Sequence, residues 1–412
     1  MTTRSICKIG VSLLLLSASL AVAHAAPIDE TEPSADESRD DGELDLFEDL
    51  GGGPSQGDVA SGRTGDPTQI SGASKSAIDA FLRGNLEECL SHLRKEVADN
   101  PDSPPPKLML AGLMFKAGQR TKCRRLLEEV AAADSNHPEL FLTFANLALE
   151  EGRWTEALLA LAEMERLGPR KSWNDQQRRM FQAALVGGRA NVATRRKNWD
   201  QAQGLLAEWM KLEPENARLR DRRATALFHA GRQKQAFEQF DIAYHQAPQA
   251  LTPPEVAMGV LHTQQGEYDQ ANRWFDKALK RHPDHAKVHF QWAMSLLFQD
   301  RADQAKAHAD QAARLGMDSV NLNVQRGIIA RQRRQLTEAV SYFEQALEQS
   351  PNHQAAHYHL VLSHLAQGES EQAFKLAQAQ SQAHPNSYWA WAGLGWTQYA
   401  HGRHDEAEEC FR

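Results

Sequence analysis

The sequence has few cysteines and no long run of basic residues. Four cysteines in 412 residues are too few for a scaffold held by disulfides, and the missing basic run argues against a nucleic-acid partner. Hydrophobic residues make up 41 % of the chain and the mean hydropathy is −0.58, which excludes a protein with many membrane spans. The length therefore leaves two options, a few globular domains or one elongated array of repeats.

Recognisable catalytic and cofactor-binding motifs are also scarce. The glycines Gly51–Gly53 are not followed by the Gly-Lys-Ser/Thr of a phosphate-binding loop. No cysteine has a catalytic context, and the neighbouring acids Glu128-Glu129 and Glu408-Glu409 lie in charge-rich helical segments, typical of solvated helix faces. We predict a protein without catalytic residues and without a cofactor.

The N-terminus has the pattern of an export signal. Arg4 and Lys8 precede an apolar run from Val11 to Ala23, which ends in the small-x-small sequence Ala23-His24-Ala25. Thirteen residues are too few to span a bilayer as a helix, which takes about twenty, although an uncleaved anchor remains the alternative. Because no cysteine follows the run, lipid attachment is not expected. The sequence predicts a signal peptide over residues 1–25 and an exported protein, periplasmic or secreted.

Residues 26–73 form an acidic, Gly- and Pro-rich segment. Thirteen acids between positions 27 and 70 stand against only Arg39 and Arg63, so this segment has a net charge of −11, whereas the whole chain has −8. Such a composition predicts a disordered linker. One stretch, Leu44–Leu50, differs because Leu46, Phe47 and Leu50 would share one helical face. It is either a short binding motif or a chance apolar cluster.

Small residues recur at a fixed spacing through the rest of the chain. Successive spacings are 34 or 35 residues with one exception of 45. A period in this range indicates a repeat architecture. The repeated positions are Cys89, Cys123, Ala157, Ala202, Ala236, Ala271, Ala305, Ala339, Ala373 and Ala407.

Other residue types keep the same phase. A second small residue stands twelve positions before most of these anchors, and a large apolar residue stands four positions after, as with Gly327 and Phe343 around Ala339. A turn glycine often precedes the anchor by five positions, and a proline often follows it by twelve. This pattern predicts two helices of about thirteen residues per repeat, which cross at the small residues. The turn glycines include Gly152, Gly231, Gly266, Gly368 and Gly402.

The pattern resembles the tetratricopeptide repeat, a helix–turn–helix unit of thirty-four residues. The best copies run from Gly152 through Ala157 to Pro169, from Gly231 to Pro248 and from Gly266 to Pro283. The resemblance implies an all-α fold, a right-handed α-α superhelix of about ten repeats over residues 74–412. It also implies a non-catalytic scaffold that binds a protein or peptide ligand.

Two departures from the period carry further expectations. The spacing of 45 contains eleven extra residues, close to three helical turns, which predicts one long helix from about Trp173 to Arg196. After Phe411 the pattern calls for the rest of a helix, so we expect the last repeat to be incomplete. Either the sequence is a fragment or a partner covers its end. If the sequence is a fragment, the alternative is that it forms the N-terminal region of a larger exported enzyme or envelope assembly and recruits a substrate or partner.

The thiols and histidines give no firm ligand site. Cys89 and Cys123 occupy the small-residue position and are interpreted as alanine substitutes in the core. Two histidine pairs with a spacing of four, His285/His289 and His353/His357, could each present two imidazoles, but a stable zinc site needs further ligands. We predict no metal site.

The resemblance places ligand contacts on the first helix of each repeat, which lines the concave groove. The alternative is that Trp389, Trp391 and Trp396 pack between repeats. A clamp for chaperone carboxylate tails is not expected, because Leu142 and Gly187 stand where its lysine would be. A third possibility is that Leu46 and Phe47 occupy the groove. The predicted groove residues are Phe290, Met294, Leu297, Phe298, Tyr358, Leu362, Leu365, Trp389, Trp396 and Tyr399.

Overall fold

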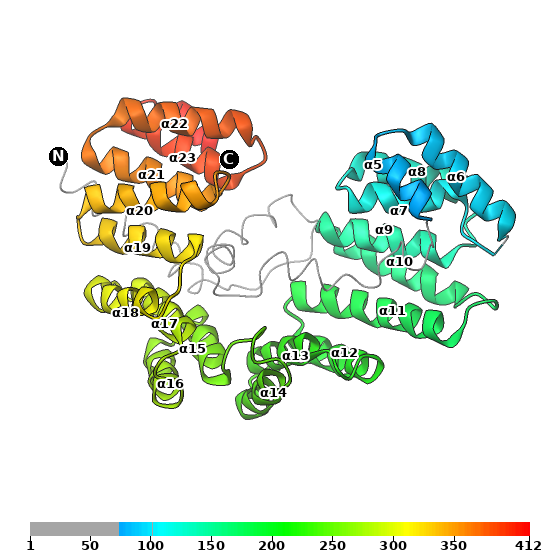
Figure 1. The fold of residues 1–412 in the computed structure, drawn as a ribbon, viewed down its shortest axis with the longest axis horizontal. Helices are drawn as coiled ribbons and strands as arrows, with labels where there is room; N and C mark the ends of the chain where they lie inside the picture. The colour runs from blue at the N-terminus through cyan, green and yellow to red at the C-terminus, as the bar shows by residue number, and fades with distance from the viewer. Residues whose placement is uncertain (1–73, 101) are drawn as a thin grey trace, which may run out of the picture. The chain divides into compact units, whose positions relative to one another are not determined.

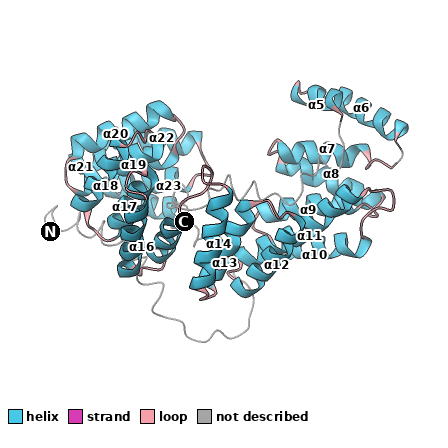
Figure 2. Ribbon diagram, turned by 60° about the horizontal axis from the view of Figure 1, so that its bottom comes forward, coloured by secondary structure: helices cyan, strands magenta, loops and turns pink. Residues whose placement is uncertain are grey.

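The computed structural model describes residues 74–412 apart from Pro101. The predicted signal peptide (1–25) and acidic linker (26–73) therefore lie outside the described residues. Within the described part, the chain forms twenty helices and no strands (Figures 1 and 2). The helices follow one another as ten pairs, which confirms the predicted all-α solenoid of about ten repeats.

The described chain divides into two compact units at Ala257/Met258, a boundary that falls within helix α15 (Pro254–Gln264). The unit before this boundary contains five helix pairs, α5 (Lys75–Leu82), α6 (Leu86–Asp99), α7 (Pro106–Lys116), α8 (Arg120–Ala133), α9 (Pro138–Glu150), α10 (Trp154–Leu167), α11 (Asp175–Arg195), α12 (Trp199–Leu212), α13 (Ala217–His229) and α14 (Gln233–Gln246). The unit after it continues with α16 (Tyr268–Arg281), α17 (Ala286–Phe298), α18 (Ala302–Arg314), α19 (Val320–Gln332), α20 (Leu336–Gln349), α21 (Gln354–Gln367), α22 (Ser370–Ala383), α23 (Tyr388–Ala400) and α24 (His404–Phe411).

Each helix pair crosses at the small residues that set the sequence period. All ten anchors from Cys89 to Ala407 are buried. A Cβ atom added to Gly327 on α19 would lie 2.5 Å from Cε1 of Phe343 on α20, closer than two carbon atoms can pack. The predicted contact between the small residue and the apolar residue sixteen positions later is therefore present. It recurs between Gly259 and Phe275 and between Gly395 and Phe411.

The turn between the two helices of a repeat adopts a left-handed backbone conformation. Gly152, Gly231, Gly266, Gly368 and Gly402 all have φ between 69° and 87°, a region that costs glycine nothing. Three repeats place another residue at the same position, five before the anchor, and it keeps the same conformation. These residues are Lys197 (φ 54°), Asp300 (φ 55°) and Arg334 (φ 63°).

The long insertion forms one extended helix, as predicted, with a corrected start. Helix α11 has 21 residues, whereas α9 and α13 have 13 each. Its N-cap is Asn174, whose side chain accepts a hydrogen bond from the Gln177 backbone N–H, while the Gln177 side chain accepts one from the Asn174 N–H. The helix starts at Asp175, two residues after the predicted Trp173, because Asn174 caps it; Trp173 lies before the cap and packs against Phe181.

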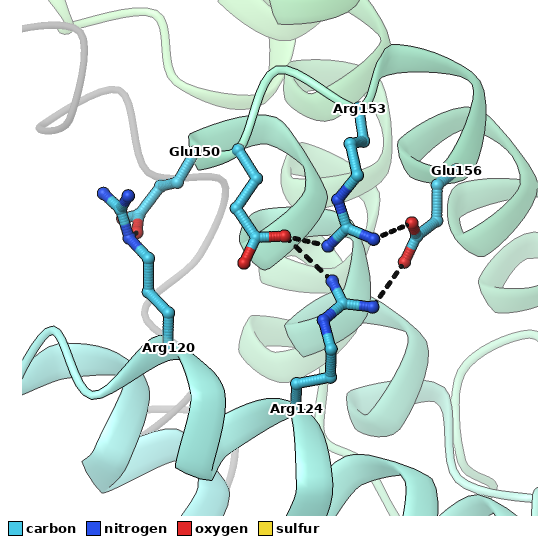
Figure 3. A network of polar contacts seen from close by, with 6 residues as sticks. Arg120, Arg124, Glu150, Arg153 and Glu156 are labelled. Atoms are coloured by element: carbon cyan, nitrogen blue, oxygen red, sulfur yellow. Dashed lines mark hydrogen bonds and ion pairs between the residues drawn. The ribbon is translucent and has the colours of Figure 1, made fainter.

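Ion pairs link successive repeats on the surface of the first unit (Figure 3). Arg124 on α8 contacts Glu151 at 2.9 Å and Glu156 at 3.2 Å, and Arg153 contacts the same two carboxylates. Arg120 lies beside this group and contacts Glu150. Because α8 and the α9–α10 turn belong to different repeats, the alternating charges connect neighbouring repeats.

Two cysteines of the described helices are buried, and neither forms a disulfide. Cys89 and Cys123 are buried and unbridged, and burial raises the pKa of Cys123 to about 12. Their burial at the crossing position matches the interpretation as alanine substitutes. None of the helices in the described residues is both long and apolar enough to cross a membrane.

Candidate protein-binding surface

The first helices of successive pairs line one side of the second unit. Helices α17, α19, α21 and α23 contact one another in sequence, whereas the second helices of successive pairs make fewer such contacts. In a curved stack the more closely spaced helices lie on the inner side. We call the surface formed by α19, α21 and α23 the inner face.

Four of the ten predicted groove residues are buried. Phe290, Met294 and Leu297 on α17 and Tyr358 on α21 are each at most 6 % exposed. Helix α19 covers α17 here, since the buried side chain of Gln325 donates a hydrogen bond to the Phe290 carbonyl at 2.9 Å. These four side chains fill the packing between repeats, and a ligand could reach them only after a rearrangement.

The other six predicted residues have accessible surface. Tyr399 is 45 % exposed, and Phe298, Leu362, Leu365, Trp389 and Trp396 are half-buried. The sequence left open whether the tryptophans bind a ligand or pack between repeats. The packing of Trp389 against Tyr358 of the preceding repeat is present, with ring centroids 5.0 Å apart, and part of the indole still reaches solvent.

Aromatic rings continue from this pair to the last helix. Trp396 lies 5.6 Å from Phe411 and 6.1 Å from Tyr399, measured between ring centroids. We call Trp389, Trp396, Tyr399 and Phe411 the aromatic cluster. Rings of this kind offer a large apolar contact area at a small entropic cost.

A cation lies close to Tyr358, the ring on which Trp389 of the aromatic cluster packs. Arg331 on α19 is half-buried, and no carboxylate of the described residues forms an ion pair with it. Its Nε atom is buried without a hydrogen-bond partner. Burial lowers the pKa of Arg331, and neighbouring Arg334 lowers it further. An arginine that has lost water without gaining an acid favours an anionic ligand.

Two polar side chains of α21 lie beside Arg331. Burial raises the pKa of Tyr358 to about 12, although Arg331 acts in the opposite direction. His359 is buried between Phe343 and Trp389, and neither ring nitrogen has a hydrogen-bond partner. Burial, with a smaller effect of Arg331, holds the pKa of His359 well below its usual value, so the ring is neutral at pH 7.

Sequence reasoning did not select Arg331 or His359. A signal for Arg331 exists, because position 331 lies 34 residues from both Leu297 and Leu365 and so shares the phase of the predicted groove residues. For His359 the sequence holds no such signal. Its lack of a partner depends on side chains from three helices.

The histidines of the two predicted pairs contact different groups rather than a shared ligand position. His353 caps α21 by accepting a hydrogen bond from the Ala356 N–H, and His357 contacts the Pro351 carbonyl. His289 contacts His308 on α18, with 2.9 Å between the two Nδ1 atoms. Within residues 74–412 without Pro101, no three His, Cys, Asp or Glu side chains gather as a possible metal site.

Sequence models of the tetratricopeptide repeat match residues 188–250, 256–320, 324–388 and 388–412, just over half of the chain. The chain belongs to the tetratricopeptide repeat family. Because this repeat is a scaffold for contacts between proteins, the protein is a protein–protein interaction scaffold. No curated protein matches the chain.

Solved structures of repeat proteins resemble the chain at low identity. Yeast Tom70 is 12 % identical, with a TM-score of 0.43, and the match covers 82 % of this chain and 96 % of Tom70. A tetratricopeptide repeat protein from Parabacteroides merdae is 15 % identical, with a TM-score of 0.38 and coverage of 72 % and 98 %. YrrB, a repeat protein with an unusual peptide-binding site, is 21 % identical, with a TM-score of 0.33 and coverage of 42 % and 89 %.

Proposed function

We propose that the tetratricopeptide repeat protein binds a peptide or helix with apolar anchors on the inner face, outside the cytoplasm. The observation that carries the proposal is the partly exposed aromatic cluster, which has three of its four rings on α23 of the inner face. Tyr388 and Trp391, on the same helix as most of the cluster, are 65 % and 38 % exposed. Exposed aromatic rings gathered on one helix favour a binding site, because they offer apolar contact area at a small entropic cost.

Partner capture tests this proposal. Immobilised wild-type protein is incubated with the extracytoplasmic fraction, and retained proteins are identified by mass spectrometry. Tyr399→Ala and Trp396→Ala/Tyr399→Ala should lose the partner, because both remove accessible ring surface from the cluster. Trp274→Ala is the matched control, since Trp274 lies on the second helix α16, where it contacts Lys277.

Circular dichroism keeps this experiment interpretable. Trp396 packs against Phe411, so the double variant also removes a packing contact. Tyr399→Ala removes a ring that is nearly half exposed and should leave helicity unchanged. If both variants retain the partner as well as wild type and Trp274→Ala do, the inner face is not the binding site.

The proposed location has a separate test. The pattern ending in Ala23-His24-Ala25 supports cleavage after Ala25. N-terminal sequencing of protein expressed in its native host should read Ala26-Pro27, and fractionation should recover it outside the cytoplasm. Cytoplasmic protein that retains residues 1–25 would contradict export.

A further inference from the structure

We propose that the inner face binds the acidic segment Leu44–Leu50 of the same chain, with Arg331 contacting a carboxylate and the aromatic cluster contacting Leu46 and Phe47. This inference rests on the proposed function, because it uses the same surface, and it adds the chemistry of the ligand. A foreign partner would then have to compete with the chain's own segment.

The positive charge of the site comes from arginine side chains that have no acidic partner. Arg331 has no ion pair in the described part of the chain, and exposed Arg334 lies close enough to lower its pKa. The other two half-buried arginines of this unit differ, since Arg333 pairs with Asp303 at 2.8 Å and Arg326 with Asp310 at 3.3 Å. Arg331 is therefore the half-buried cation that an incoming carboxylate can neutralise.

The neighbours of Arg331 connect it to the aromatic cluster. Tyr358 and His359 are both buried, and the ring nitrogens of His359 lack hydrogen-bond partners in the described residues. Trp389 packs on both rings, with centroids 5.0 Å from Tyr358 and 6.2 Å from His359. The site thus joins an anion-binding group to an aromatic surface, which suits a peptide that carries acids and large apolar residues together.

Leu44–Leu50 has this combination. Asp45, Glu48 and Asp49 alternate with Leu46, Phe47 and Leu50, and basic residues are absent from the stretch. One helical turn can direct the apolar side chains to one face while the acids flank them. More than twenty residues separate Leu50 from Ser74, and an extended chain of this length reaches about 75 Å. The segment therefore lies on a long tether.

Fluorescence anisotropy with a labelled peptide of residues 42–52 tests the contact on full-length protein. Leu46→Ala/Phe47→Ala should bind the peptide at least tenfold more tightly than wild type, because a tethered competitor acts at an effective concentration of about millimolar. In this double-variant background, Arg331→Gln should weaken peptide binding about tenfold, as expected for one lost hydrogen bond to a charged group. Arg333→Gln is the control. It also removes one positive charge, but from an arginine that already pairs with Asp303, so it should change peptide binding less than twofold.

A second peptide separates charge from apolar contact. Replacing Asp45, Glu48 and Asp49 by their amides should reduce binding to the double variant and remove the difference between Arg331→Gln and Arg333→Gln. Circular dichroism and thermal denaturation of each variant show that the inner face remains folded.

Three results would overturn the inference. The first is equal peptide affinity for wild type and Leu46→Ala/Phe47→Ala, and the second is equal affinity for the two arginine variants. The third is self-association of wild type that disappears in the double variant, since the segment would then bind a second copy. If the peptide binds no variant while Tyr399→Ala still abolishes partner capture, the inference fails and the proposed function stands.

Discussion

Alanine at two helical glycines should change stability in opposite directions. Both Gly327 on α19 and Gly204 on α12 lie inside helices, where Gly→Ala typically stabilises by about 1 kcal/mol. A Cβ at Gly204 would meet nothing within 4 Å, so the full gain is expected there. At Gly327 the new Cβ would lie 2.5 to 2.8 Å from three ring atoms of fully buried Phe343.

The size of the effect at Gly327 follows from this overlap. Carbon atoms pack at about 3.5–4.0 Å, so the Phe343 ring must move by about 1 Å within a filled core. Overpacking of this kind costs about 1–3 kcal/mol, which exceeds the gain in helix propensity. We expect Gly327→Ala to destabilise by about 1 kcal/mol and Gly204→Ala to stabilise by about 1 kcal/mol.

Urea denaturation followed by circular dichroism measures both changes. Phe343→Leu is the diagnostic second substitution, because a smaller side chain makes room for the added methyl group. The double variant Gly327→Ala/Phe343→Leu should be more stable than the sum of the single effects, by about 0.5–3 kcal/mol. If Gly327→Ala stabilises as Gly204→Ala does, or if the two changes are additive, the crossing is not closely packed and the reasoning is wrong.

Three further predictions concern the turns, the ion pairs and a buried histidine. Lys197→Gly and Arg334→Gly should each stabilise by about 0.5–1 kcal/mol, because both residues hold a positive φ; lower melting temperatures would refute this. Arg124→Met should cost about 0.5–1 kcal/mol in dilute buffer and less at high salt, and a loss that does not depend on salt would contradict the ion-pair account. Burial lowers the pKa of His308 from 6.5 to about 4. As the pH falls, His308 is therefore protonated in the unfolded chain before it is protonated in the folded chain, and stability should fall between pH 6.5 and pH 4. In His308→Phe this part of the fall, measured by urea denaturation across that pH range, should disappear, and an unchanged pH profile would exclude His308 as its source.

The repeat architecture could be predicted because it depends on local sequence and on contacts between neighbours. Each helix pair needs small residues at the crossing, a large apolar residue to fill the space and a turn with positive φ, and all three recur with one period. The contact between Gly327 and Phe343 therefore follows from spacing alone. The long helix α11 follows as well, since eleven inserted residues preserve the buried face.

The binding surface could be predicted only in part. Periodicity places Tyr358 and Tyr399 on equivalent helices, yet Tyr358 is buried and Tyr399 is exposed. The difference arises because Trp389 of the next repeat packs on Tyr358. A repeat pattern predicts the direction in which a side chain leaves its own helix. Whether that side chain is buried depends on residues of other helices.

The sequence by itself determined the number of repeats, the helix pairs and the position of each turn, because these are set by residues close along the chain. The tertiary structure decided which inner-face side chains stay accessible and that Arg331 lacks an acidic partner. It also decided that Lys197, Asp300 and Arg334 adopt the glycine conformation. These properties depend on packing between elements, where neighbouring helices impose burial, charge environment and backbone geometry that no single repeat encodes.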